Sequence, residues 1–154
     1  MRILITGNLG YIGSVMSNIL TKQGHDVIGY DIGYYKDCIT SEYTPEKKQI
    51  NKDLRKLEEE DLENIDYVIH LASLSNDPLG AFIPKLKEEI NYNATIKLAE
   101  ISKKKKVKRF IFASSQSIYG VSKIDKELDE DTSVKDPITA YAITKWKAEQ
   151  EIMQ

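Results

Sequence analysis

Short apolar stretches alternate with longer amphipathic stretches along this chain. The apolar stretches, bounded by turn residues, predict five strands at Arg2–Thr6, Asp26–Tyr30, Gln49–Asn51, Tyr67–Leu71 and Arg109–Ala113. Apolar residues at helical spacing predict four helices at Ile12–Gln23, Leu54–Asn64, Pro84–Lys103 and Ala140–Met153. The polar segment Tyr34–Lys48 is predicted to be a surface loop. Unbroken apolar runs such as Tyr67–Ile69 and Phe110–Phe112 are typical of strands buried on both faces.

The alternation of strands and helices predicts an α/β fold class. Strands separated by helical segments pair in parallel, with helices on both faces of the sheet. Right-handed crossovers leave few topologies, and the sequence predicts a doubly wound parallel sheet of five strands in the order 3-2-1-4-5. The 154 residues are enough for one such domain, over residues 1–154. Ligands of such sheets bind beyond the carboxyl ends of the strands.

A glycine-rich segment, Thr6–Gly13, joins the first predicted strand to the first predicted helix. Its glycines, Gly7, Gly10 and Gly13, allow a sharp turn and a close approach to a ligand. The helix that follows offers backbone N–H groups and the positive end of its dipole to a phosphate. Three glycines alone also fit an ordinary strand–turn–helix, so the neighbouring residues have to decide between these interpretations.

Asp31 supports the phosphate interpretation, because it directly follows the second predicted strand. A carboxylate there can accept hydrogen bonds from the hydroxyls of an adenosine ribose. It would repel a 2′-phosphate, and no arginine follows to receive one. The sequence therefore predicts a dinucleotide cofactor and favours NAD over NADP.

Two segments carry side chains suited to catalysis. Ser115 follows the fifth predicted strand and can donate to a substrate oxygen, although serine is also common in tight turns. Tyr141 and Lys145 lie one turn apart on one face of the last predicted helix. A nearby ammonium favours the phenolate of a tyrosine, which can then take a proton from a sugar hydroxyl while hydride leaves the same carbon. A simple surface contact is the alternative for this pair.

The Tyr-x-x-x-Lys spacing also occurs at Tyr43–Lys47 and Tyr119–Lys123. The first pair encloses Pro45 within the polar loop, and the second has Gly120 beside its tyrosine, so neither is expected to lie in a helix. Only Tyr141–Lys145 lies in a long helical pattern.

Composition narrows the classes of function. The net charge of −2 gives no general attraction to nucleic acid or membranes, and the basic run Lys103–Lys106 is expected to be solvated at a helix end. No apolar run is long enough to cross a membrane and no signal peptide is recognisable, so a cytoplasmic location is expected. Cys38 has no second cysteine to pair with, and two distant histidines, His25 and His70, do not suggest a metal site. His70 lies in an apolar strand and is expected to be packed.

Together these segments resemble the extended short-chain dehydrogenase/reductase family, the NAD-dependent nucleotide-sugar epimerases and dehydratases with a Rossmann-type fold. The resemblance covers essentially the whole chain, and its seven motifs in one order are more specific than any single motif. In chain order they are similar to Thr6–Gly13, Asp31, Asp53-Leu54-Arg55, Leu71-Ala72-Ser73 after His70, Asn91–Thr95, Ser114–Gly120 and Tyr141–Lys145. Asn8 and Ala94 depart from the family pattern, which has a small residue and a glycine there.

The resemblance implies a role for each motif. Ser115 would polarise the reacting oxygen, Tyr141 would act as acid and base, and Lys145 would lower the pKa of Tyr141 and bind the nicotinamide ribose. The Asp53 segment would hold the adenine. The cofactor-binding residues implied are Gly7, Asn8, Gly10, Tyr11, Ile12, Gly13, Asp31, Asp53, Leu54, Leu71, Ala72, Ser73, Asn91, Tyr141 and Lys145.

The family also frames the alternatives. Its 4,6-dehydratases place an Asp-Glu pair after the catalytic hydroxyl, whereas Gln116-Ser117 follow Ser115, which argues against elimination of water by that route. A nucleotide-sugar epimerase is the primary hypothesis, and a nucleotide-sugar dehydratase or reductase is an alternative. Chains of the family are about double this length, and the half absent here carries the domain that holds the nucleotide sugar. A non-catalytic NAD-binding module is therefore a second hypothesis. Family dimers pair helices equivalent to 84–103 and 140–153, so a homodimer is also expected.

Overall fold

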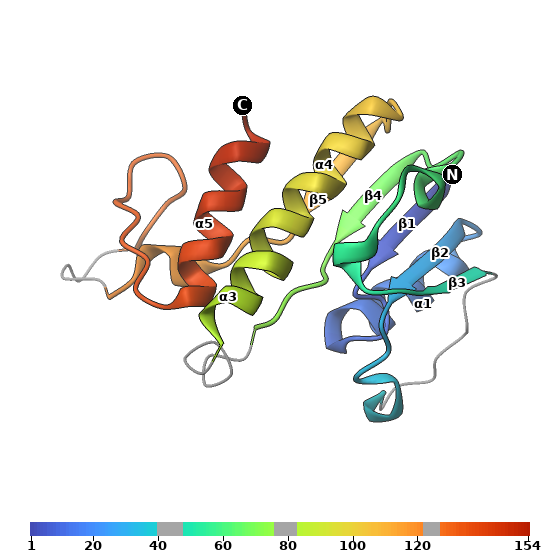
Figure 1. Cartoon of the computed structure of the whole chain (residues 1–154), viewed down its shortest axis with the longest axis horizontal. Coiled ribbons are helices and arrows are strands. Elements are labelled where there is room, and N and C mark those ends of the chain that lie inside the picture. The colour runs from blue at the N-terminus through green and yellow to red at the C-terminus, as the bar shows by residue number, and fades with distance from the viewer. Residues whose placement is uncertain (40–47, 76–82, 122–126) are drawn as a thin grey trace.

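The strands form one parallel sheet in the computed structural model, which describes residues 1–39, 48–75, 83–121 and 127–154 (Figure 1). The strands are β1 (Arg2–Thr6), β2 (Asp26–Asp31), β3 (Lys48–Asn51), β4 (Tyr67–His70) and β5 (Arg109–Phe112). They pair in parallel in the order β3-β2-β1-β4-β5, which confirms the predicted topology. The order switches beside β1, and ligands of such sheets bind at this switch.

Helices cover both faces of the sheet. α1 (Tyr11–Lys22) lies on one face, on the side of Ile3 and Ile5 of β1. α4 (Ala94–Lys104) lies on the other face, on the side of Leu4. Because successive side chains of a strand point to opposite faces, β1 contributes to both hydrophobic cores.

A long helical segment corresponds to the predicted helix Pro84–Lys103. It consists of α3 (Pro84–Lys87), a π-helical stretch η4 (Glu88–Asn93), and α4. α5 (Ala140–Ile152) packs beside this segment and contacts all three parts (Figure 1). π-helical turns are rare and occur frequently at functional sites, so the stretch around η4 is a natural place to look for one.

The predicted helix Leu54–Asn64 is wrong. This segment instead forms two short 3₁₀ turns, η2 (Leu54–Lys56) and η3 (Glu59–Leu62). The Asp53 carboxylate accepts the Arg55 N–H, and the Asp61 carboxylate accepts the Glu58 N–H, at 2.9 Å in both cases. Short acidic side chains that bind nearby N–H groups offer the backbone an alternative to an α-helix.

β5 is less buried than its apolar sequence predicts. It is the outermost strand, and the Ile111 side of the strand is open, with this residue 46% exposed. Phe110, one residue earlier, packs against the core on the α4 side. The expectation that β5 is buried on both faces is therefore wrong for the part of the chain that the structure describes.

Two sequence expectations concern segments at the surface. The predicted loop Tyr34–Lys48 contains a 3₁₀ turn, η1 (Lys36–Cys38), and its last residue already belongs to β3. Residues 40–47 lie outside the described residues, and so does the Tyr43–Lys47 pair. Within the described ranges, no helix combines the length and the apolar character needed to cross a membrane.

Candidate active site

The glycine-rich segment forms a tight turn between β1 and α1. Gly7 has a φ of +76°, and its N–H donates to the Tyr30 carbonyl at 2.9 Å. A Cβ on Gly13 would lie 2.0 Å from the Gly7 carbonyl oxygen, so a larger residue would displace the backbone. Gly10 precedes Tyr11, where α1 begins, and the first N–H groups of a helix have no partner within it. The turn therefore directs backbone donors beyond the carboxyl end of β1, as a phosphate requires.

The Asn8 side chain links this turn to β3, at the edge of the sheet, through a hydrogen bond. It is completely buried, and its Nδ2 donates to Gln49 Oε1 on β3 at 2.8 Å. Gly29 on β2 makes room for the pair, because a Cβ there would lie 2.2 Å from Asn8 Nδ2 and from Gln49 Oε1. The sequence analysis missed Gln49 and Gly29, because no motif surrounds them. Only the fold brings these two residues next to the turn.

Asp31 ends β2 next to the same turn. Its Oδ2 accepts the Leu9 N–H at 3.2 Å, and its Oδ1 accepts the Gly33 N–H at 2.7 Å. The carboxylate is half-buried. The structure thus brings the Asp31 carboxylate and the glycine-rich turn together, as the sequence predicts for a ribose next to a pyrophosphate.

The segment after β4 runs closely past the glycine-rich turn. The Leu71 N–H donates to the Thr6 carbonyl at 3.0 Å, and a Cβ on Gly7 would lie 2.7 Å from the backbone nitrogen of Ala72. The Ser73 hydroxyl oxygen is buried and has no hydrogen-bond partner among the described residues. This hydroxyl lies in the segment that follows β4, the strand next to β1.

Asn91 holds the same segment to the helical layer. On η4, its Oδ1 accepts the Leu74 N–H at 2.8 Å, and its Nδ2 donates to the Leu74 carbonyl at 3.1 Å. The side chain is buried and bridges η4 to the loop after β4. In this structure Asn91 therefore shapes the wall of the candidate site.

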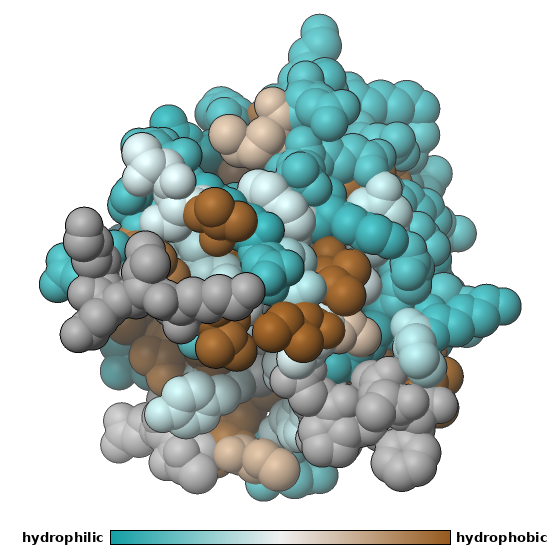
Figure 2. Space-filling model, turned by 90° about the vertical axis from the view of Figure 1, so that its left-hand side faces the viewer, coloured by the Kyte–Doolittle hydropathy of each residue, from teal (hydrophilic) through white to brown (hydrophobic). Residues whose placement is uncertain are grey.

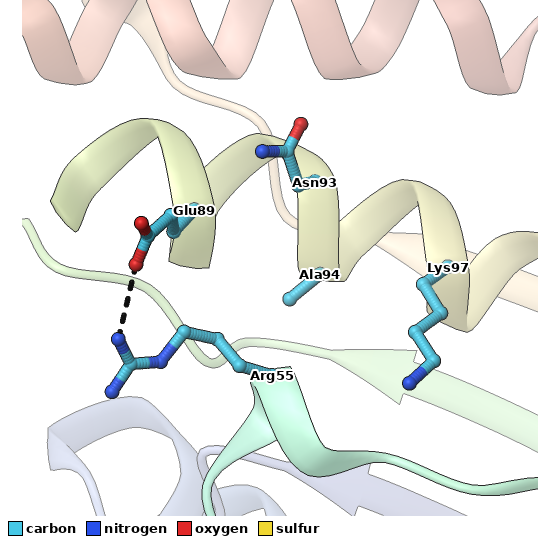
Figure 3. Close-up of a pocket in the computed structure, with 5 residues that line it drawn as sticks. All are labelled: Arg55, Glu89, Asn93, Ala94 and Lys97. Atoms are coloured by element: carbon cyan, nitrogen blue, oxygen red, sulfur yellow. Dashed lines mark hydrogen bonds and ion pairs between the residues drawn. The ribbon is translucent and has the colours of Figure 1, made fainter. Parts of the chain in front are cut away.

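Asp53 and Arg55 form an ion pair at the end of β3. Arg55 Nη2 lies 2.6 Å from Asp53 Oδ2, and Arg55 Nη1 lies 3.1 Å from Glu89 Oε2 on η4 (Figure 3). The Arg55 guanidinium holds the pKa of the Asp53 carboxyl below its usual value. Leu54 between them is buried in the core. The Arg55–Glu89 pair borders a pocket of about 330 Å³, lined by Arg55, Glu89, Asn93, Ala94 and Lys97 (Figure 3).

Lys145 reaches from α5 to the end of β5. Its side chain is buried, and its Nζ donates to the Ala113 carbonyl at 2.8 Å. The same ammonium lies 4.6 Å from the ring centroid of Phe112 and 5.8 Å from that of Tyr141. Burial lowers the pKa of Lys145 to about 8. The predicted pair is therefore a buried ammonium next to a half-buried phenol, and the alternative of a simple surface contact does not apply.

Ser115 begins the short turn η5 (Gln116–Tyr119), which follows β5 and packs against α5. Its Oγ accepts the Ser117 N–H at 3.2 Å and lies 2.8 Å from Ser117 Oγ. Ser115 is thus two residues beyond the carbonyl that binds Lys145, on a turn that faces the helix of Tyr141. The Tyr119–Lys123 pair cannot be compared with it, because Lys123 lies outside the described residues.

His70 is packed inside the sheet, as expected. Its Nδ1 lies 2.6 Å from Thr6 Oγ1 and its Nε2 lies 2.7 Å from Thr95 Oγ1. Burial and, second, the charge of Lys145 lower the pKa of His70 to about 3. The neutral imidazole therefore joins β1, β4 and α4.

Lys87 is a site residue that the sequence analysis missed. It ends α3, is 1% exposed, and places its Nζ 5.7 Å from the ring centroid of Tyr141. Its place four residues before Asn91, on the same helix face, is the signal that could have identified it.

Apolar side chains gather on one part of the surface, which the space-filling view shows as a group of brown residues among polar ones (Figure 2). Exposed large apolar residues on the described part of the chain include Ile111 on β5 and Ile143 on α5.

The fold and these residues define a class. A parallel sheet with a glycine-rich turn after β1, an acidic residue ending β2 and a Tyr-x-x-x-Lys pair on a helix after β5 is the arrangement of an extended short-chain dehydrogenase/reductase. Residues 3–153 match the NAD dependent epimerase/dehydratase family, and the chain belongs to this family.

Similar proteins include Protein CapI and two UDP-glucose 4-epimerases. Protein CapI of Staphylococcus aureus is 30% identical over 94% of this chain and 46% of its own length. UDP-glucose 4-epimerase of Lactobacillus helveticus is 30% identical over 97% of this chain and 46% of its own length. UDP-glucose 4-epimerase of Thermus thermophilus, solved in complex with NAD, superimposes with a TM-score of 0.85 at 28% identity, over 99% of this chain and 50% of that one. The chain thus spans about half the length of these relatives.

Proposed function

We propose that this chain forms the NAD-binding and acid/base half of a nucleotide-sugar epimerase. The observation that carries the proposal is the buried Lys145 ammonium beside Tyr141, in a chain of the epimerase/dehydratase family. Two relatives that are 30% identical over at least 97% of this chain are named UDP-glucose 4-epimerases. Their names support epimerisation of a UDP-sugar as the reaction. Gln116-Ser117 after Ser115, in place of the Asp-Glu pair of the 4,6-dehydratases, also favour an epimerase over a 4,6-dehydratase.

The cofactor would lie across the carboxyl ends of β1, β2 and β4. The backbone around Gly7, Gly10 and Gly13, with the N–H groups of Tyr11 and Ile12, would hold the pyrophosphate. Since the Asn8 side chain is already bound to Gln49, Asn8 would contribute through its backbone.

Side chains at the ends of β2 and β3 would hold the adenosine. The Asp31 carboxylate would bind the adenosine ribose, and Asp53 with the backbone of Leu54 would contact the adenine. The segment after β4, from Leu71 through Ala72 to the buried Ser73 hydroxyl, would line the inner side of the cofactor, next to Asn91.

The chain's own groups would move the proton. Tyr141 would take a proton from a hydroxyl of the sugar, and the Lys145 ammonium would stabilise the phenolate and bind the nicotinamide ribose. The Ser115 hydroxyl would donate to the same sugar oxygen and orient it. When bound, NAD would supply the hydride acceptor and donor, and return of hydride to the opposite face of the sugar carbon would invert that centre. Tyr141 would return its proton to the oxygen.

The test is an assay of the purified protein with NAD and a panel of UDP-sugars, with the products separated by chromatography. We expect interconversion of one epimer pair, and a fall in kcat of about 100-fold or more in Tyr141→Phe. Tyr92→Phe is the matched control, because its hydroxyl bonds to Glu151 away from the candidate site. Full turnover by Tyr141→Phe would refute the acid/base role.

A non-catalytic NAD-binding module is the second candidate. The chain covers only about half of the relatives it matches. Calorimetric titration separates the two candidates. A module binds NAD and gives no heat with any UDP-sugar, whereas an epimerase half with its sugar site binds both.

A further inference from the structure

The Ser115 hydroxyl belongs to a small hydrogen-bond network in the turn after β5. Its Oγ accepts the Ser117 N–H at 3.2 Å and lies 2.8 Å from Ser117 Oγ. The same Oγ lies 3.3 Å from Gln116 Oε1, to which it donates. Three contacts therefore meet at the Ser115 oxygen, and two of them come from Ser117.

The direction of the bond between the two hydroxyls follows from a count of donors and acceptors. A serine hydroxyl has one proton to donate and two lone pairs that accept. If Ser117 donates to Ser115, the Ser115 proton can go to Gln116 Oε1, and both protons have an acceptor. If Ser115 donates to Ser117 instead, the Ser117 proton has no acceptor among the described residues, and the bond to Gln116 is lost. The first arrangement makes one hydrogen bond more, so the network favours Ser117 as the donor.

With Ser117 as the donor, the Ser115 oxygen has no lone pair left for another donor. One lone pair accepts the Ser117 N–H, and the other accepts the Ser117 O–H. The one hydrogen bond that Ser115 can still offer a ligand uses its own proton. That proton is weakly held, because its distance of 3.3 Å to Gln116 Oε1 exceeds the usual O–H···O distance of about 2.7–2.8 Å. Ser115 can therefore donate to a ligand oxygen, but it cannot accept a proton from one.

We propose that Ser117 is a positioning residue that makes Ser115 a hydrogen-bond donor only toward its ligand. This inference rests on the proposed function, in which Ser115 donates to a sugar oxygen. That oxygen gives its proton to Tyr141 and becomes a carbonyl oxygen, so it needs a donor that stays in place throughout. If Ser115 accepted the sugar hydroxyl, it would compete with Tyr141 for the proton. Ser117 prevents this competition, because its hydroxyl occupies the second lone pair of Ser115.

Kinetics test the consequence for the reaction. We expect Ser117→Ala, which keeps the backbone N–H, to lower kcat for the UDP-sugar about 10-fold with little change in KM. Ser117→Thr keeps the hydroxyl and should restore most of kcat. In Ser115→Ala, the change Ser117→Ala should cause no further loss, because Ser117 acts through Ser115. Ser133→Ala is the matched control, since its hydroxyl also accepts a backbone N–H, that of Asp129, at 2.8 Å. An unchanged kcat in Ser117→Ala, or an equal loss in both backgrounds, would overturn the proposal.

Neutron diffraction from crystals exchanged into D₂O tests the network itself, because it locates the hydroxyl deuterium atoms. We expect a deuterium on Ser117 Oγ directed at Ser115 Oγ, and one on Ser115 Oγ directed at Gln116 Oε1. A Ser115 deuterium directed at Ser117 Oγ, or a Ser117 deuterium directed at solvent, would overturn the proposal. The measurement needs neither substrate nor turnover, so in an inactive chain it decides the proposal alone. Inactivity with the expected deuterium positions would contradict only the proposed function.

Discussion

His70 and Lys145 show how single residues divide structural and chemical work at this site. His70 is held by two threonine hydroxyls and remains neutral, because burial lowers its pKa to about 3. Lys145 is almost equally buried, yet its ammonium is bound only through a backbone carbonyl and ring faces among the contacts described above. A buried cation held by neutral groups can still respond to an anion at Tyr141, whereas the histidine cannot.

The lowered pKa of Lys145 predicts a pH-dependent stability. In the folded protein burial lowers this pKa from 10.5 to about 8. Between pH 8 and 10.5 the unfolded chain therefore holds the proton that the folded chain has released, and the free energy of unfolding rises with pH. Relative to Lys145→Met, the wild type should gain about 3 kcal/mol across this window, at about 1.4 kcal/mol per pH unit.

Urea unfolding at several pH values, followed by the fluorescence of the single tryptophan Trp146, measures this difference. Other titrating groups are common to both proteins and cancel. Lys147→Met is the control for the loss of a lysine from the same helix, because its side chain is 47% exposed. A difference between the wild type and Lys145→Met that stays constant with pH would show that burial does not lower the pKa of Lys145.

At the scale of elements, the turn after β1 owes its geometry to a strand two places away in the sheet order. Asn8 and Gln49 bind each other through their amides, and Gly29 on the strand between them leaves the space. The glycine-rich turn and β3 are therefore linked by buried side-chain hydrogen bonds. Such a link lets a change on β3 alter the proposed cofactor site without a contact to the cofactor.

Double substitution tests this link. Gln49→Ala should lower the free energy of unfolding by about 1–3 kcal/mol and weaken NAD binding, because it leaves the buried Asn8 amide without this partner. The double variant Asn8→Ala/Gln49→Ala should lose much less than the sum of the two single losses. Urea unfolding and calorimetric titration with NAD are the measurements. Additive losses would mean that the two amides stabilise the protein independently.

The same scale explains where sequence patterns succeeded and failed. The β1 and α1 boundaries follow from local apolar spacing and glycines, and the structure reproduces them within a residue. The helix predicted at Leu54–Asn64 does not form, because the acidic side chains Asp53 and Asp61 bind the backbone there. Helix propensity and apolar periodicity do not account for hydrogen bonds from these side chains that compete with the hydrogen bonds of a helix.

For the whole molecule, the strand order could be predicted because few topologies satisfy parallel pairing and right-handed crossovers. The contacts that complete the candidate site could not be predicted from the sequence. Gln49 is 41 residues from Asn8, and the approach of Lys87 to Tyr141 depends on how α3 packs on α5. The exposure of Ile111 likewise depends on what covers an edge strand, which its own apolar run cannot reveal.

Cofactor binding should stabilise the whole molecule, because the proposed NAD site joins segments from β1 to η4. A ligand that binds only the folded state raises the free energy of unfolding by about 2.7 kcal/mol at 100 times its Kd. We expect NAD to raise the thermal midpoint of the chain and NADP to raise it much less, since Asp31 would repel a 2′-phosphate. Asp31→Asn keeps an acceptor for the Leu9 or Gly33 N–H and should reduce the difference between the two cofactors. Thermal unfolding with each cofactor, followed by circular dichroism, measures these shifts, and equal shifts in the wild type would remove Asp31 from cofactor selection.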